Sequence, residues 1–201
     1  MTDDFGSAST YQSRLMVVIA STRPGRVGLP VAEWFADRAR AESAFELDVA
    51  DLAELDLPMM DEPNHPRFGK YEHQHTRDWS ARVDAADAFA FVMPEYNYGL
   101  TAPLKNAIDY LNQEWHYKPI GFVSYGGVSA GTRAVQMAKQ VVTTLRMVPV
   151  FEAVSIPFVG QMIDDEGGLT ANSVMEEAAT AMLVELERVG KALRPLRSGQ
   201  L

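Results

Sequence analysis

The sequence predicts an α/β domain built on a doubly wound, five-stranded parallel sheet with helices on both faces. Five short apolar runs alternate with segments whose apolar residues repeat at helical spacing, and this alternation is typical of βαβ units. The chain has 201 residues, enough for one domain with a full core. No internal repeat or long linker divides it, so we expect a single domain.

Each predicted element follows from its hydrophobic pattern. The predicted strands are residues 15–20, 45–50, 89–93, 120–124 and 150–154. The predicted helices are residues 29–43, 74–86, 101–113, 131–146 and 172–193, and the last carries an apolar stripe with a period of about 3.6 residues. Five such strands fit the flavodoxin-like order 2-1-3-4-5, for which flavodoxin is the type example. We expect residues 14–197 to form this domain and residues 1–13 to be a flexible tail.

Charge and composition exclude several classes of function. The chain has 18 Lys and Arg against 27 Asp and Glu, a net charge of −9, which argues against nucleic acid or an anionic membrane as partner. It has no cysteine, which rules out disulfides, thiolate nucleophiles and Cys-ligated metals. The N-terminus lacks an apolar signal segment, and no apolar run approaches the ~18 residues that span a bilayer. We therefore expect a cytoplasmic protein without membrane insertion.

Three unusual loops follow the first, third and fourth predicted strands. Because these strands are neighbours in the predicted order, their carboxyl ends meet at one crevice, where ligands bind in open parallel sheets. The loop at residues 94–99, Pro-Glu-Tyr-Asn-Tyr-Gly, supplies a carboxylate, two aromatic faces and a carboxamide. Such a set can lie along a planar heteroaromatic ring and bond to its edge. The alternatives are that Tyr96 and Tyr98 pack under the next helix and that Glu95 caps it.

The loop at residues 21–28, Ser-Thr-Arg-Pro-Gly-Arg-Val-Gly, precedes the first predicted helix. A helix N-terminus presents unpaired N–H groups and the positive end of the helix dipole. Arg23 and Arg26 can add charge-assisted bonds to phosphate oxygens, and glycines 25 and 28 allow close approach of the backbone. The loop predicts phosphate binding, with a solvated turn as the alternative.

The loop at residues 124–131 combines four small residues with one aromatic, which permits close approach of a flat ring. Residues 127–131 also fit G-x-S-x-G, the nucleophile elbow of α/β-hydrolases. That triad needs a histidine after Ser129 in chain order, whereas all four histidines precede it. We therefore expect Ser129 to be a helix N-cap and keep the hydrolase as a minor alternative.

Three of the histidines, His65, His73 and His75, cluster in sequence and raise the question of a metal site. The region is polar and holds two prolines, and no helix or strand face aligns these side chains with a carboxylate. Clusters of this kind have low specificity. We predict a solvated loop and no metal.

Four segments together identify a resemblance: residues 21–26, Pro-Glu-Tyr-Asn at 94–97, Leu-Lys-Asn-Ala-Ile-Asp at 104–109, and Lys-Pro at 118–119 leading to Ser-Tyr-Gly-Gly at 124–127. Over residues 15–157 the chain resembles the NADPH-dependent FMN reductase family, within the flavodoxin-like superfamily. The resemblance implies an FMN site made of the following residues: Ser21, Arg23, Arg26, Val27 and Gly28 at the phosphate; Pro94, Glu95, Tyr96 and Asn97 along the ribityl chain and ring; Ser124, Tyr125, Gly126 and Gly127 at the ring. Many relatives have Ser and Asn where this chain has Arg26 and Gly28.

The resemblance also implies the chemistry. NADPH or NADH would reduce FMN, and a small molecule would accept the electrons: a quinone, an azo or nitro compound, a metal oxyanion or free flavin. The cofactor performs this reaction, so we name no catalytic side chain. A flavodoxin-type electron carrier is the main alternative. We also expect a homodimer or homotetramer, because Trp79, Trp115, Tyr117 and the tyrosines of the loops exceed what one crevice needs.

Overall fold

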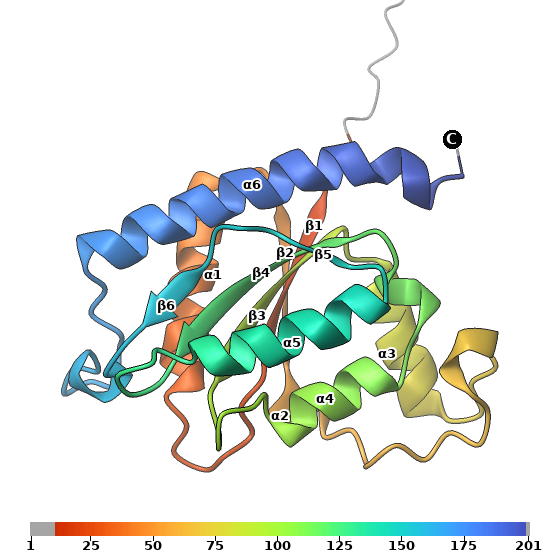
Figure 1. Cartoon of the computed structure of the whole chain (residues 1–201), viewed down its shortest axis with the longest axis horizontal. Coiled ribbons are helices and arrows are strands. Elements are labelled where there is room, and N and C mark those ends of the chain that lie inside the picture. The colour runs from red at the N-terminus through yellow and green to blue at the C-terminus, as the bar shows by residue number, and fades with distance from the viewer. Residues whose placement is uncertain (1–10, 200–201) are drawn as a thin grey trace, which may run out of the picture.

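The described part of the computed structural model, residues 11–199, is a parallel sheet with helices on both faces (Figure 1). The strands are β1 (Arg14–Ile19), β2 (Glu46–Asp51), β3 (Ala88–Pro94), β4 (Pro119–Tyr125), β5 (Val148–Pro149) and β6 (Val154–Ile156). They lie in the order β2-β1-β3-β4-β5, with β6 also paired to β4, and all pairs are parallel. The predicted order 2-1-3-4-5 is therefore confirmed.

Helices α1 (Gly28–Glu42) and α6 (Ser173–Arg197) cover one face of the sheet, and α3 (Gln74–Asp84), α4 (Ala102–Asp109) and α5 (Thr132–Thr144) cover the other. A short helix α2 (Leu52–Leu55) follows β2. Residues 11–199 also hold three 3₁₀ turns: η1 (Pro66–Phe68), η2 (Gln113–Trp115) and η3 (Val159–Gln161). Thr101 and Asn172 cap α4 and α6 through their side-chain oxygens.

The two faces of β3 have side chains of different size. All seven residues of β3 are buried, as is usual for a strand covered on both sides. Phe89, Phe91 and Met93 face α3, α4 and α5, whereas the alternate residues Ala88, Ala90 and Val92 face α1 and α6. The aromatic side of the core also takes Trp79 and Trp115, whose rings meet edge to face at 6.1 Å.

Because Trp79 and Trp115 are each only 1% exposed, the expectation that these two residues belong to a subunit interface is wrong. Each indole N–H donates to a backbone carbonyl inside the core, Trp79 to Ala107 and Trp115 to Ile108. A buried tryptophan needs such a partner, and these two find theirs within the chain.

The predicted fifth strand, residues 150–154, is wrong in its extent. Two short pieces replace it: β5 pairs with the start of β4, and β6 pairs with the end of β4 at Val123–Tyr125. Between them the chain leaves the sheet, and Phe151 is 92% exposed. The second piece, β6, also contacts the loop that follows β4, because Ile156 accepts a hydrogen bond from the N–H of Gly126 at 3.2 Å.

Most of the expected flexible tail, residues 1–10, lies outside the described residues. Its last residues pack at the amino ends of the strands: the Tyr11 hydroxyl donates to Asp87 at 2.8 Å, and the Arg194 guanidinium lies 3.6 Å from the centre of the Tyr11 ring. Arg197, at the end of α6, pairs with the same carboxylate at 2.7 Å.

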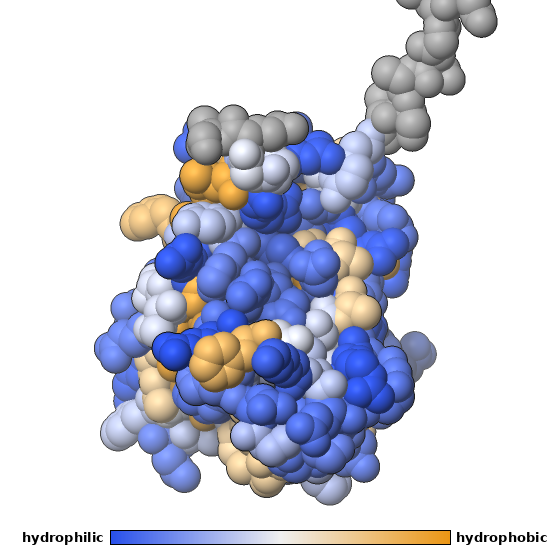
Figure 2. Space-filling view, turned by 90° about the vertical axis from the view of Figure 1, so that its right-hand side faces the viewer, coloured by the Kyte–Doolittle hydropathy of each residue, from blue (hydrophilic) through white to orange (hydrophobic). Residues whose placement is uncertain are grey.

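The outer surface is mainly hydrophilic on the face drawn in Figure 2, with hydrophobic residues scattered between the hydrophilic ones. Within residues 11–199, no helix is both long and apolar enough to cross a bilayer. The cytoplasmic location stays a prediction.

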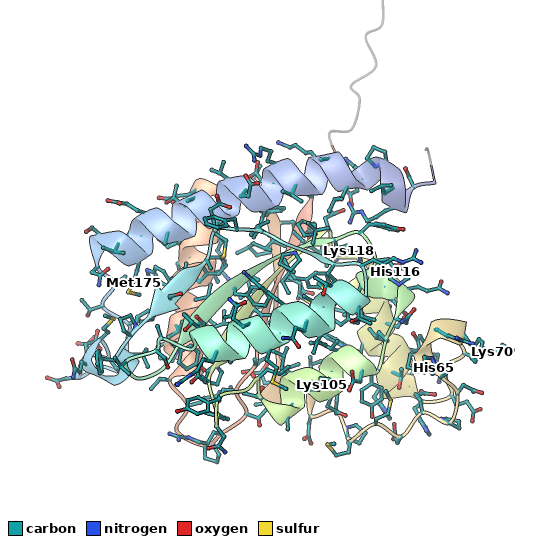
Figure 3. The ribbon with its side chains drawn as sticks, viewed as in Figure 1. His65, Lys70, Lys105, His116, Lys118 and Met175 are labelled. Atoms are coloured by element: carbon teal, nitrogen blue, oxygen red, sulfur yellow. The ribbon has the colours of Figure 1, made fainter. Side chains whose placement is uncertain are left out.

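Lys118 is a buried cation directly before β4 (Figure 3). Its side chain is at the end of α3, where Nζ donates to the carbonyl oxygens of Val83 at 2.8 Å and Asp84 at 2.9 Å. Cations stabilise helix C-termini, but this residue is only 4% exposed. Burial accordingly lowers the pKa of Lys118 to about 8, while the nearby Asp84 opposes that shift.

This pKa makes folding stability depend on pH. Between pH 8 and the unfolded value of 10.5, the unfolded chain retains a proton that the folded chain has released, so stability rises with pH. We expect Lys118 to contribute a gain of about 2 kcal/mol between pH 8 and 10. Urea unfolding of the parent and of Lys118→Met at pH 7, 8, 9 and 10 measures it as the difference between the curves. Parallel curves would show that the folded lysine keeps an ordinary pKa.

Candidate cofactor site

The three loops predicted to share a crevice do meet at the carboxyl ends of β1, β3 and β4. The Ser21 and Tyr96 hydroxyls are 2.9 Å apart, which joins the first loop to the second. Glu95 receives hydrogen bonds from Ser129 and Arg133, which joins the second loop to the third and to α5. These side-chain contacts hold the loops as one surface.

The first loop is a tight turn that leads into α1. The N–H of Arg26 bonds to the carbonyl of Arg23 at 3.1 Å, with Pro24 and Gly25 between them. Gly25 has φ +69°, and Pro followed by a residue with positive φ is typical of a type II turn. Val27 occupies the N-cap of α1, where no side chain accepts a hydrogen bond. The helix therefore presents its first N–H groups and its positive end to a ligand.

The two arginines of this loop have different positions. Arg23 is exposed. Arg26 turns inward, where its NH1 donates to Asp51 Oδ1 at 2.7 Å and to the Ser21 carbonyl at 2.8 Å, and its NH2 pairs with Asp51 Oδ2. Asp51 also caps α2. Arg26 thus ties the loop to the end of β2, and its contact with phosphate stays a prediction.

The second loop is a two-residue hairpin. Tyr96 and Gly99 exchange backbone hydrogen bonds of 3.1 and 3.0 Å, and the two residues between them, Asn97 and Tyr98, have φ +49° and +69°. Positive φ at both central positions is typical of a type I′ turn. Tyr96 and Tyr98 are exposed, so the alternative that both pack under the next helix is wrong.

Glu95 has a role that the sequence did not reveal. The expected alternative, a cap on the following helix, is wrong because Thr101 caps α4. Glu95 instead accepts from the Arg133 backbone N–H at 3.0 Å and from the Arg133 Nε at 2.5 Å, near the start of α5. Hydrogen bonds from Arg133 hold the pKa of Glu95 below its ordinary value. The signal was present as a carboxylate and an arginine 38 positions apart, but only the fold brings them together.

Ser129 is not the N-cap of α5, which corrects the expectation from sequence. Gly131 takes that position with φ +79°, and a side chain there would come within 2.9 Å of the Tyr125 carbonyl oxygen. The Ser129 hydroxyl donates to Glu95 at 3.3 Å and accepts from Arg133 at 2.6 Å. In the described chain no histidine is among these side-chain partners, and Figure 3 places His65 and His116 toward the other end of α5.

The third loop has a buried floor and an open rim. Ser124 and Tyr125 are buried, whereas Gly126 and Gly127 line a cleft of about 420 Å³ together with Asn97, Tyr98 and Arg133. Gly127 has open space where a Cβ would be. A flat ring can therefore lie over the glycines, with Ser124 and Tyr125 beneath them.

Tyr125 lies under the first loop. A Cβ at residue 28 would overlap the Tyr125 hydroxyl oxygen, and the ring carbon Cζ would be 3.4 Å away. Within residues 11–199 this buried hydroxyl has no hydrogen-bond partner, and burial raises the pKa of Tyr125. The contact with Tyr125 thus requires glycine at residue 28.

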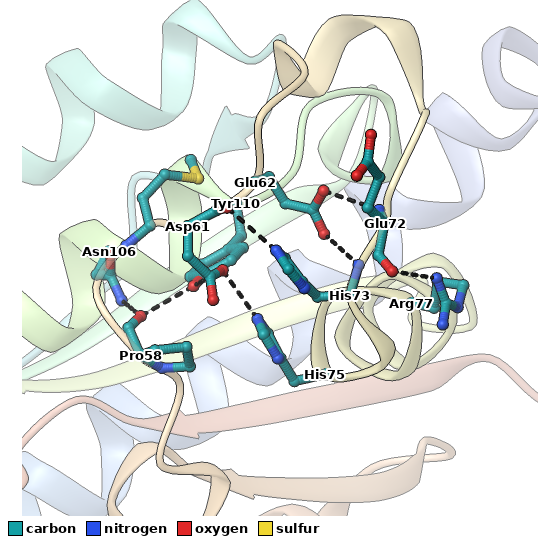
Figure 4. Close-up of polar contacts among 10 residues, drawn as sticks. Pro58, Asp61, Glu62, Glu72, His73, His75, Arg77, Asn106 and Tyr110 are labelled. Atoms are coloured by element: carbon teal, nitrogen blue, oxygen red, sulfur yellow. Dashed lines mark hydrogen bonds and ion pairs between the residues drawn. The ribbon is translucent and has the colours of Figure 1, made fainter.

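Two of the three clustered histidines, His73 and His75, belong to a polar network (Figure 4), whereas His65 accepts a hydrogen bond from the Arg67 N–H. His73 and His75 stack at 5.2 Å, and their Nε2 atoms bond to the Asp61 carbonyl at 3.2 Å and the Asp61 carboxylate at 3.0 Å. Tyr110 donates to that carboxylate at 2.9 Å, so the network ties residues 58–73 to α3 and α4. Across the described residues, no group of three or more His, Cys, Asp or Glu could hold a metal.

The profile of the NADPH-dependent FMN reductase family matches residues 13–161. The chain belongs to this family. An NAD(P)H-dependent FMN reductase of Schizosaccharomyces pombe is 38% identical over 148 residues, which are 72% of this chain and 74% of that one. Family membership identifies the chain as an NAD(P)H-dependent oxidoreductase that uses FMN.

One further relative and one solved structure extend the comparison. An NAD(P)H:quinone oxidoreductase of Solanum tuberosum is 41% identical over 63 residues, 30% of this chain and 32% of that one. The flavoenzyme NAD(P)H:acceptor oxidoreductase FerB of Paracoccus denitrificans superposes with a TM-score of 0.67 over 90% of this chain and 97% of its own, at 18% identity. The structural likeness supports the fold.

The contact between Gly28 and Tyr125 gives a testable double-mutant cycle. Gly28→Ala should destabilise the reductase by about 1–3 kcal/mol through overpacking. Tyr125→Phe removes the overlapping oxygen, so Gly28→Ala should cost much less in that background. Gly160→Ala, where a Cβ meets nothing within 4 Å, is the matched control. Chemical unfolding of the parent, the two single variants and the double variant measures the coupling, and strictly additive effects would contradict the contact.

Proposed function

We propose that the reductase holds FMN across the three loops and uses NADPH or NADH to reduce a small-molecule acceptor. The acceptor class comprises quinones, azo and nitro compounds, metal oxyanions and free flavin. One observation carries the proposal: the N-terminus of α1, which has no side-chain cap, and the cleft lined by Gly126 and Gly127 both lie at the carboxyl ends of the strands. When bound, FMN supplies the redox chemistry, and the chain supplies position and electrostatics.

The phosphate end of the ligand fits the first loop. The N–H groups at the start of α1 point out of a helix with no side-chain cap, and Arg23 adds an exposed cation. Within the described chain, the Arg23 side chain makes no hydrogen bond to protein that would compete with a phosphate. Val27 and Gly28 supply backbone only, and Ser21 lies buried beneath with its hydroxyl bound to Tyr96.

The ring end fits the second and third loops. Pro94 ends β3, and the hairpin that follows places Asn97 in the wall of the cleft, while the Tyr96 hydroxyl contacts Ser21 of the first loop. Gly126 and Gly127 leave room for a flat ring, and the backbone of Ile156 and Val159 fixes their position through hydrogen bonds of 3.2 Å to Gly126. None of these groups acts as an acid or base, because hydride transfer requires orientation and exclusion of water.

Turnover tests this proposal. The purified protein should show the absorption of bound flavin or bind added FMN more tightly than riboflavin, and it should oxidise NADPH in the presence of a quinone. Donor and acceptor share one open ring face, so double-reciprocal plots should be parallel. Ser129→Ala should retain this activity. Intersecting lines would contradict the shared face, and flavin binding without NAD(P)H oxidation would indicate an electron carrier.

The two arginines of the first loop should separate by mutation. Arg23→Ala should weaken FMN binding by about 2–4 kcal/mol, as for one partner of a desolvated charge pair, and should leave the stability of the flavin-free protein unchanged. Arg26→Ala leaves the buried Asp51 carboxylate uncompensated and should destabilise the flavin-free protein by about 3–5 kcal/mol. Fluorescence titration and urea unfolding measure the two effects. Equal FMN affinity in Arg23→Ala would leave Arg23 a solvated turn residue.

We also propose a homodimer, which could pair further into a tetramer. Support comes from a groove of about 690 Å³ between α4 and α5, which Met60, Ile108 and Met137 line from three segments. Met137 is 45% exposed, and Phe68 lies exposed close by. Exposed apolar side chains gathered along one groove are typical of an interface.

A charge placed in the groove tests the assembly. Met137→Glu should shift the protein toward a monomer of 22.2 kDa in light scattering at micromolar concentration, because burial of an unpaired carboxylate is costly. Val184→Glu, at an exposed position on α6, is the control and should leave the mass unchanged. A parent that is itself monomeric would refute the dimer.

A further inference from the structure

We propose that Arg133 is the cation that faces the carbonyl-bearing edge of the flavin ring and favours its reduced, negatively charged form. This inference rests on the proposed function of the cleft. Arg133 was not part of the predicted site. The structure places it on the first turn of α5, in the wall of the glycine-lined cleft.

Burial sets the charge that this cleft presents. Glu95 and Arg133 are the two charged residues that line it, but the Glu95 side chain is 6% exposed and that of Arg133 is 47% exposed. The carboxylate also accepts the Arg133 backbone N–H at 3.0 Å, so the positive end of α5 offsets part of its charge. The cleft therefore presents a cation, although the whole chain has a net charge of −9.

The guanidinium is held in a fixed orientation. Glu95 accepts from its Nε at 2.5 Å, Ser129 accepts from its NH2 at 2.6 Å, and its flat face lies 3.7 Å from the centre of the Tyr98 ring. Among the residues that the structure describes, its NH1 makes no hydrogen bond. Because Nε, NH2 and one face of the planar guanidinium are already held, NH1 can bind a ligand with little further loss of side-chain entropy.

The two ends of an isoalloxazine ring differ in chemistry. One end carries two carbonyls and ring nitrogens, and the other carries methyl groups. Within residues 11–199 the Gly126 N–H is already bonded to Ile156, but Arg133 NH1 and the Gly127 N–H remain as donors on this side of the cleft, so the carbonyl-bearing end fits here. The nicotinamide gives up one hydride, which is two electrons and one proton, and the ring that gains it carries one additional negative charge. A cation at the carbonyl edge stabilises that charge and raises the reduction potential.

Substitution at residue 133 separates charge from shape. Arg133→Gln keeps a hydrogen-bonding side chain and removes the charge, whereas Arg133→Lys keeps the charge and loses the fork. Arg146→Gln is the matched control, because Arg146 follows the other end of α5 and lies 5.7 Å from the centre of the Tyr117 ring. The readouts are the FMN dissociation constant by fluorescence and the midpoint potential of the FMN-loaded protein by dye-linked reductive titration.

We expect Arg133→Gln to lower the equilibrium constant for reduction about tenfold, which is about 30 mV for a two-electron couple. Arg133→Lys should retain most of the parent potential, and Arg146→Gln all of it. An unchanged potential in Arg133→Gln with FMN bound would overturn the inference, as would an equal fall in Arg133→Lys. If Arg133→Gln fails to hold FMN, Arg133→Lys alone decides: a midpoint potential close to that of the parent supports the inference, and a fall of about 30 mV overturns it. A parent that binds no FMN would instead refute the proposed function.

Discussion

The complete burial of β3 is the constraint on which the site depends. A strand covered on both faces is fixed in register on both sides, and β3 pairs Val92 with Ile19 of β1 and Pro94 with Tyr125 of β4. All three strands therefore end at nearly the same level. The loops that follow them begin side by side, so direct hydrogen bonds between side chains connect them. A slip of one residue would turn Phe91 toward α1 and Ala90 toward α4, and the core could not accept it.

Two ion pairs hold the loops of the site, and other side chains in those loops stay exposed. Arg26 with Asp51 fixes the first loop, and Glu95 with Arg133 fixes the second loop against α5. Both pairs place a well-buried carboxylate under a less buried arginine. Each pair is costly to break because the remaining charge would lie out of water. The groups that remain exposed, Arg23 and the open edge of Arg133, are then positioned by structure that a ligand need not supply.

Much of the fold was predictable because it is local. The strand and helix positions follow from hydrophobic periodicity, and the loops at the crevice follow from strand order. The loop expected at residues 94–99 does follow directly on β3. What the sequence could not show are pairings across long separations: Arg26 with Asp51, Glu95 with Arg133, and the burial of Trp79 and Trp115. A sequence motif shows which residue types are present at a site, but not which of them form hydrogen bonds or ion pairs with one another.

Contacts between distant parts of the chain also explain why the predictions for Ser129 and for the fifth strand were wrong. Serine before a helix usually caps it, yet here the close approach of residue 131 to the Tyr125 carbonyl requires glycine at the cap. The apolar run at residues 150–154 predicted a continuous strand, yet its middle leaves the sheet and only its flanks pair with β4. In both cases a contact with β4 or its loop decided against the local preference.

The interruption between β5 and β6 has a consequence for how copies of this protein can meet. An unbroken outer strand would offer a row of backbone donors and acceptors to another chain, which is the usual route to edge-to-edge sheet extension. Here that row is two residues, a gap and three residues. A second copy therefore finds no continuous row of backbone groups with which to extend the sheet along this side, whereas β2 at the opposite edge is unbroken over six residues.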